Sequence, residues 1–198
     1  MNLLNSKNYS KEIVIDNFQN KVVNICDINN CTNINLSIDV MNDSTLTLNI
    51  NSISSNYTQK NINIFLNHKG SNSKSFVNFF GASLDESSIS IKMSSKTEGL
   101  FNISIDQNIR GLLLSENSSI KGEPILIVSK KDAKVNHALS IGPISKEIIF
   151  YLKTKNLTKK EIIQAIIESY FINMINIANI SEKKIIESKI KEIINGNK

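Results

Sequence analysis

Hydrophobic and polar residues alternate with a period of two through most of the first 128 residues. In residues 33–40, isoleucine, leucine or valine stands at every second position, with asparagine, serine or aspartate between them. The same alternation returns at residues 46–50, 62–66, 89–93 and 101–105. This pattern is typical of β-strands with one buried face, and the polar segments between them are typical of turns. The sequence therefore predicts a long series of strands without an intervening helix.

A β-sandwich, a β-barrel and a β-solenoid are all compatible with such a series. Two features favour the solenoid. The later strands recur at roughly 11–14 residues, and their apolar positions hold mainly isoleucine, leucine and valine, which stack well from coil to coil. In addition, seven glycines and two prolines are few for a sandwich built from many hairpins. Periodicity alone leaves the three architectures open, with the solenoid favoured.

In the last part of the chain the apolar period changes to 3.6, which predicts three helices. Ser145 is the expected N-cap of a short first helix. Thr158 and Glu161 form a capping-box pattern before the second helix. Ser181 is the expected cap of the third helix, which should end just before Gly196.

This change of period divides the chain into a predicted β-helix core, residues 1–143, and a predicted C-terminal helical domain, residues 144–198. The helices carry a broad apolar stripe, which must pack against the β-helix, against itself or against a partner. Charge is also uneven along the chain. Residues 129–198 hold thirteen lysines against seven acidic residues, and this segment supplies the excess behind the net charge of +5.

Composition narrows the class of protein. The chain has 198 residues, of which 40% are hydrophobic and 21% charged, as in a globular protein. The lysines of the basic end lie on isoleucine-rich amphipathic stretches, without an aromatic RNA-binding motif or a Cys/His finger, so nucleic-acid binding is not expected. No uninterrupted apolar run reaches the roughly 18 residues of a membrane span, and the N-terminus does not resemble a secretory leader. We expect a cytoplasmic protein.

Few residues offer chemistry. No phosphate-binding loop, nucleophile elbow or zinc-protease motif is present. Cys26 and Cys31 are five residues apart and lack further ligands nearby, so buried structural thiols are favoured over a metal site. His68 follows a strand in the segment Asn-His-Lys-Gly, and we expect it to be a solvated turn residue. His137 lies between the last predicted strand and the first helix.

Several segments together resemble the SufB/SufD family, which forms the scaffold of the SUF machinery for iron–sulfur cluster assembly. They are residues 79–85 (FFGASLD), 111–117 (GLLLSEN), 123–127 (EPILI), 135–142 (VNHALSIG) and 149–152 (IFYL). The order and spacing match over roughly residues 75–180. Each segment is unspecific by itself, whereas the series as a whole is fairly specific.

The resemblance implies a right-handed parallel β-helix followed by a helical domain. In this family the β-helices of two subunits associate, and the C-terminal helices dock the ATPase SufC. The N-terminal helical region of many members has no counterpart here, which suggests a minimal version of the family.

The resemblance also implies which type of subunit this is. SufB-type members carry a cysteine where this chain has Ile109, and a glutamate where it has Ala138. His137 remains, and it matches the histidine that SufD contributes to the cluster site between SufB and SufD. We therefore expect a SufD-like scaffold subunit without catalytic residues. His137 is its expected ligand for a transient iron–sulfur cluster at the subunit interface, and the isolated chain is expected to hold none.

Two surfaces are expected to carry these partnerships. The apolar segments 112–114 and 125–128 should form a late coil that pairs with a SufB-type subunit. The helices should bind the ATPase through an apolar centre with a rim formed by Lys159, Lys160, Lys183 and Lys184. Two alternatives stay open. The chain could be the sole SufBD-type subunit of its organism and act as a homodimer, or it could be a carbohydrate-active or structural β-solenoid of another class.

Overall fold

The computed structural model describes residues 1–29, 31–129 and 132–195. Its eleven strands are β1 (Asn2–Leu3), β2 (Asn8–Ile15), β3 (Asn20–Asp27), β4 (Asn33–Val40), β5 (Thr45–Ser54), β6 (Gln59–His68), β7 (Lys74–Ser83), β8 (Ser88–Thr97), β9 (Ser104–Leu113), β10 (Ser119–Ile127) and β11 (Lys134–Pro143). Three helices follow: α1 (Lys146–Thr154), α2 (Lys159–Ile177) and α3 (Ile180–Asn195).

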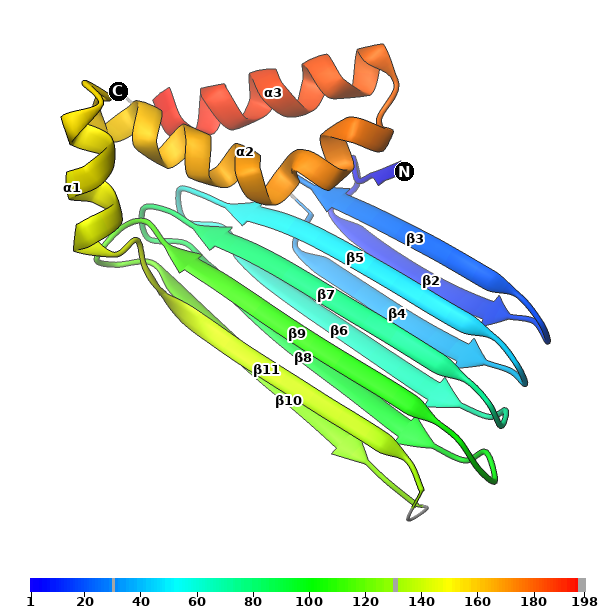
Figure 1. Cartoon of the computed structure of the whole chain (residues 1–198). Helices are drawn as coiled ribbons and strands as arrows, with labels where there is room; N and C mark the ends of the chain where they lie inside the picture. Colours follow the sequence, from blue (N-terminus) through cyan, green and yellow to red (C-terminus); the bar gives the residue numbers. More distant parts are fainter. Residues whose placement is uncertain (30, 130–131, 196–198) are drawn as a thin grey trace.

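The strands form two parallel sheets that face each other (Figure 1). One sheet holds the odd-numbered strands in the order β1-β3-β5-β7-β9-β11, and the other holds β10-β8-β6-β4-β2. Each strand therefore pairs with the strand one coil later, so that Lys74 pairs with Ser104 and Ser104 with Lys134. This is the β-solenoid that the alternating pattern favoured, and it makes about five turns.

Alternate side chains of both sheets fill the space between them. Isoleucine, leucine and valine dominate this lumen, and most of them have no solvent exposure. Because parallel strands in register point the same residues inward, each apolar side chain stacks on its equivalent one coil away. The period of two in the sequence thus becomes one continuous core along the solenoid axis.

Asparagine and aspartate shape the turns. Asp43, Asn72 and Asn102 occupy equivalent turn positions with φ of 52°, 52° and 51°. These residues tolerate the left-handed conformation better than other non-glycine residues. The Nδ2 of Asn72 donates to Oδ1 of Asp43, and that of Asn102 to Oδ1 of Asn72, both at 3.0 Å. The asparagine-rich composition therefore supports the stacking of successive coils.

The helices lie over the C-terminal ends of the odd-numbered strands (Figure 1). There, a second apolar cluster joins the two parts of the chain. Phe80 of β7 stacks on Tyr170 of α2 with ring centroids 4.1 Å apart, and it meets Phe171 edge-on at 6.1 Å. Asn51 of β5 donates from Nδ2 to the Tyr170 carbonyl oxygen at 2.9 Å. The apolar stripe of the helices thus packs against the solenoid as well as between α2 and α3, and the proposed division at residues 143 and 144 stays a prediction.

Two of the expected helix caps are present and one lies elsewhere. Ser145 accepts a hydrogen bond from the backbone of Ile148, and Thr158 forms a complete capping box with Glu161. The expected cap at Ser181 is wrong, because α3 begins at Ile180 and Asn179 Oδ1 accepts from the Glu182 backbone at 2.9 Å. The expected end at Gly196 lies outside the described residues. Within the described part of the chain, none of the helices is long and apolar enough to cross a membrane.

Candidate functional site

His137 lies inside β11, in the middle of the last strand of the odd-numbered sheet. The expectation that it follows the last strand is therefore wrong. Its register partner on β9 is Gln107, which is fully buried and reaches across the lumen. Since paired residues of parallel strands point to the same face, His137 belongs to the inward-facing row. Its side chain is nevertheless exposed, because β11 belongs to the last coil and nothing described in the structure covers it.

The last coil leaves the solenoid open at this end. β10 and β11 are the outermost strands of their sheets, so each has one unpaired edge in the described structure. Leu139, also in the inward row, is 47% exposed although its Cδ1 reaches over Gly122 of β10. At the C-terminal end of β10, Ile127 and the following Val128 are 47% and 42% exposed. We refer to this surface, formed by β10, β11 and the side chains of their inward rows, as the open end.

Only one of the two segments expected at this edge lies there. Residues 125–128 belong to β10 and its continuation, as expected. Leu112 of β9 instead lies one strand inside the sheet, and both Leu112 and Leu114 pack with the apolar cluster under the helices. The expectation that residues 112–114 form part of the free edge is therefore wrong, because β11 adds one further strand.

The lumen beside His137 contains an unsatisfied polar atom. Gln107 donates from Nε2 to Oγ of Ser95 at 2.7 Å and to the carbonyl oxygen of Met93 at 3.3 Å. Its Oε1 is buried and has no hydrogen-bond partner. Gln107 was not among the predicted site residues, although its place between Ile105 and Ile109 in the alternating pattern marks it as a polar residue at a buried position.

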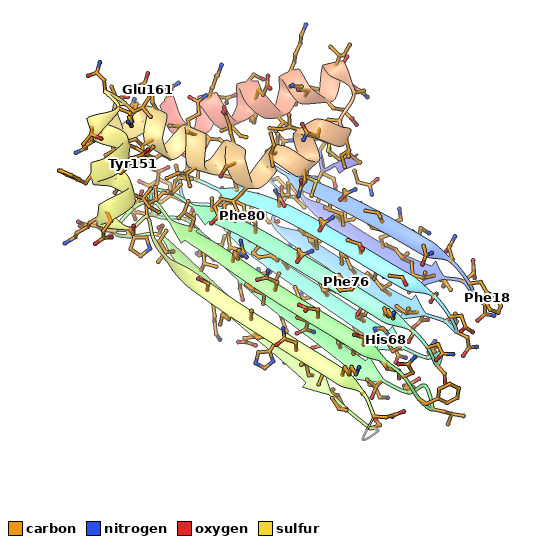
Figure 2. The ribbon with its side chains drawn as sticks, viewed as in Figure 1. Phe18, His68, Phe76, Phe80, Tyr151 and Glu161 are labelled. Carbon is orange, nitrogen blue, oxygen red and sulfur yellow. The ribbon has the colours of Figure 1, made fainter. Side chains whose placement is uncertain are left out.

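His68 is buried, in contrast to the solvated turn residue that we expected. It ends β6 with no solvent exposure, and its ring nitrogens lie 2.7 Å from Oγ of Ser73 and 2.8 Å from Oγ of Ser75. Burial lowers the pKa of His68 from 6.5 to about 4, so the ring is neutral in the native protein. Figure 2 shows it near the turns far from the helices. His68 is thus a structural residue of the lumen.

The two cysteines are buried, free and in different parts of the core. Cys26 belongs to the cluster under the helices, whereas Cys31 belongs to the lumen. Burial raises the pKa of the Cys26 thiol to about 12, and the neighbouring Asp27 adds to this effect. No group of three or more potential ligands gathers among the described histidine, cysteine, aspartate and glutamate residues. Both cysteines fit the interpretation as structural thiols.

One buried ion pair was not predicted from the sequence. Nζ of Lys60 lies 2.6 Å from Oδ2 of Asp27, and both side chains are almost completely buried. Ser52 donates to the same carboxylate oxygen at 2.7 Å. Burial raises the pKa of Asp27, against the lowering effect of Lys60. In β6, Lys60 occupies the same alternating row as Ile62 and Ile64, and this pattern predicts an inward-facing lysine.

The helices expose two separate apolar patches. The α1 patch consists of Ile148, Phe150 and Tyr151, which are 49%, 71% and 60% exposed, and α1 buries none of its residues. The α2–α3 patch consists of Ile177, Ile180 and Ile185, which are 52%, 78% and 46% exposed.

The four lysines expected to form one rim divide between these patches. Lys159 and Lys160 begin α2 next to α1, whereas Lys183 and Lys184 lie in the first turns of α3. The two helices run antiparallel (Figure 1), and α2 is about 28 Å long at 1.5 Å per residue. The two lysine pairs therefore lie at opposite ends of the helix pair, and each flanks a different patch.

Comparison with known proteins assigns most of the chain to one family model. Residues 19–170 match the family model of the SufBD core domain of the SUF system for iron–sulfur cluster assembly. Over 130 residues the chain is 27% identical to the iron–sulfur cluster assembly protein SufD of Bacillus subtilis, an alignment that covers 63% of this chain and 30% of that protein.

Two archaeal relatives carry the same family name. A SufBD family protein of Archaeoglobus fulgidus is 36% identical over 61 residues, which cover 31% of this chain and 16% of the relative. One from Methanocaldococcus jannaschii is 27% identical over 107 residues, which cover 54% of this chain and 33% of the relative. The chain thus matches about a third or less of the length of these relatives. Because the family model covers most of its length, the chain belongs to the SufBD family of iron–sulfur cluster assembly proteins.

Proposed function

We propose that this chain is a non-catalytic, SufD-like scaffold subunit, which pairs with a SufB-type subunit through the open end and docks a SufC-type ATPase through its helices. The observation that carries the proposal is the open end itself. It combines two unpaired strand edges, the exposed inward-facing Leu139 and His137 in one surface. An exposed strand edge of this kind is a template for pairing with another chain.

The residues of the open end favour a SufD-like role over a SufB-like one. Ile109 is fully buried in the lumen on β9, next in the inward row after Gln107. A SufB-type cysteine there would point into the lumen. Ala138 follows His137 on β11 and faces outward. Without that thiolate and carboxylate, the chain supplies one imidazole, a borderline ligand that suits iron. The cluster is then held together with ligands of a partner subunit and passes through the site as cargo.

Pairing is tested by mixing the purified chain with a SufB-type protein at micromolar concentration and measuring the mass by light scattering. We expect a one-to-one mixed dimer. Leu139→Glu should weaken it, because a charge would then be buried at the interface. Val22→Glu is a matched control, since Val22 is 63% exposed on β3 near the other end of the solenoid. Failure to form the mixed dimer would contradict the assignment.

The same measurement on the chain alone tests the homodimer alternative. A mixed dimer with a monomeric chain supports the SufD-like role. A stable dimer of the chain alone that Leu139→Glu disrupts, and that does not exchange with the SufB-type protein, would replace that role with a sole SufBD-type subunit.

The helical surface supports the second half of the proposal. Helix α1 exposes three large apolar side chains and buries none, so its own packing does not explain them. Aromatic residues with a rim of positive charge are typical of the centre of a protein interface. We assign SufC docking to the α1 patch, with Lys159 and Lys160 as its salt-sensitive rim.

A further inference from the structure

The buried amide of Gln107 is satisfied on one side only. Its Nε2 donates across the lumen to Ser95 and Met93, and more distantly to the Ile125 carbonyl oxygen at 3.4 Å. These contacts turn the amide nitrogen toward the even-numbered sheet. Oε1 has no partner although Gln107 has no solvent exposure. A buried carbonyl oxygen without a donor is costly, so a donor within reach would stabilise this arrangement.

Within its own sheet, the neighbours of Gln107 leave one source for that donor. On its own strand, Ile105 and Ile109 flank it in the inward row. In the next coil inward, its register partner on β7 is the buried Val77. All three side chains are apolar. The fourth neighbour is His137, its register partner on β11.

His137 is in the converse situation. Its neighbours in the inward row of β11 are Val135 and Leu139, which are apolar, and beyond β11 the sheet ends. Within the described structure its ring makes no hydrogen bond, and it is exposed. An exposed imidazole on an edge strand samples other rotamers readily, and inward-facing side chains of paired strands lie within reach of each other. Rotation toward the lumen would turn the ring toward Gln107, its register partner.

We propose that Gln107 is a positioning residue for His137, whose imidazole donates one ring N–H to the free Oε1 of Gln107. Because a neutral imidazole has one N–H, this bond fixes the tautomer and leaves the other ring nitrogen with a free lone pair. This inference rests on the proposed function, because the ring nitrogen left free is the one that a cluster at the open end would bind. A hydrogen bond behind a histidine ligand orients the ring and strengthens metal binding.

The test uses the two histidines of the chain. The full chain is labelled with 15N-histidine, and long-range 15N–1H spectra are recorded at about pH 8, where ordinary imidazoles are neutral. His68 serves as the internal reference because both of its ring nitrogens are held by serine hydroxyls. We expect His137 to give the spectrum of a single tautomer. Gln107→Met, which keeps the length but removes the acceptor, should convert it to a mixture of both tautomers.

Ser95→Ala is the matched control. It removes the other hydrogen bond of the Gln107 side chain, from Nε2 at 2.7 Å, and keeps Oε1. If Gln107 merely fills the lumen, Gln107→Met and Ser95→Ala should both lower stability and leave the His137 spectrum unchanged. That result, or a mixture of tautomers already in the wild-type chain, would overturn the proposal.

Cluster loading on the complex with a SufB-type subunit tests the positioning role of Gln107 and the ligand role of His137 separately. If Gln107 positions His137 and His137 binds the cluster, Gln107→Met should reduce the cluster yield per folded complex, by roughly tenfold, without changing the mass by light scattering. A changed tautomer with an unchanged yield would support Gln107 as the positioning residue and contradict His137 as a cluster ligand. An unchanged tautomer would overturn the positioning role whatever the yield.

Discussion

Two histidines of this chain occupy inward positions of the same solenoid and meet opposite environments. His68 is enclosed by later coils and bound by Ser73 and Ser75. His137 stands in the last coil with no hydrogen bond in the described structure. The position along the solenoid axis, rather than the residue type, therefore decides which histidine is structural and which is available to a ligand.

His137→Ala should leave the fold intact and impair cluster assembly. The ring is exposed, so its loss should change the free energy of unfolding by less than ~0.5 kcal/mol. Loss of one ligand from a site of few ligands should lower the cluster yield on the mixed complex by about tenfold or more. Thermal unfolding and cluster absorbance measured on one preparation test both statements. Ser140→Ala on the outward row of β11 is the control, and an unchanged yield for His137→Ala would refute the ligand role.

His68 should make the protein sensitive to acid. Its pKa is about 4 in the folded protein and 6.5 when exposed, so the unfolded chain binds the proton first as the pH falls. The stabilisation is complete above pH 6.5 and is lost toward pH 4, at about 1.4 kcal/mol per pH unit. Denaturant unfolding of wild-type and His68→Gln proteins across this range gives the measurement. The wild type should be the more stable at pH 7.5, and the difference should shrink with acid; a constant difference would contradict the assignment.

At the scale of the elements, the alternation of apolar and polar residues continues further along two strands than our predictions followed it. Residues 33–40, 46–50, 62–66 and 89–93 all lie in strands whose alternate apolar residues face the lumen. The same period continues through Leu66 to His68, and through Val135 to Leu139 across His137. In both segments, polar residues and glycine typical of turns hid the continuation, and both histidines were assigned to loops.

Other features depend on contacts that a local pattern does not contain. The unsatisfied oxygen of Gln107 follows from the pairing of β9 with β7 and β11, and from the contact with Ser95 on the opposite sheet. The family resemblance identified His137 but did not place it within a strand, because the spacing of motifs contains no information on strand register.

Helix α1 supplies the element-level prediction. Phe150→Glu should weaken binding of the SufC-type ATPase by about 2 kcal/mol or more, roughly 30-fold in Kd, because aromatic anchors at interface centres carry most of the affinity. The fold should be unaffected, since Phe150 is 71% exposed. Titration by calorimetry measures the loss. Ile180→Glu in the α2–α3 patch, where Ile180 is 78% exposed, is the matched control. The larger loss in that variant would move the docking site to the other patch.

At the scale of the whole molecule, the solenoid and the helices depend on each other through one apolar cluster. Cys26, Ile53 and Phe80 of the odd-numbered sheet are covered by Phe171 of α2 and Ile190 of α3. A chain cut after residue 143 would expose these side chains to water. Removing the helices therefore tests docking of a partner less cleanly than a substitution on their outer surface does.

The two buried cysteines report separately on the two parts of the molecule. Cys26 lies under the helices and Cys31 in the lumen, so release of the helices alone would expose only Cys26. Phe171→Ala, at a side chain with no exposure, should weaken helix docking by roughly 3–5 kcal/mol. We expect alkylation of Cys26 to accelerate strongly, while alkylation of Cys31 stays as slow as in the wild type. Mass spectrometry of the labelled peptides measures both rates, and Ile172→Ala, at a residue 48% exposed, is the control.

If alkylation of both thiols accelerates together, the chain unfolds as one cooperative unit and residues 144–198 are not a domain of their own. If Cys26 alone responds, the helices form a separable unit whose contact with the solenoid a docked ATPase could bias.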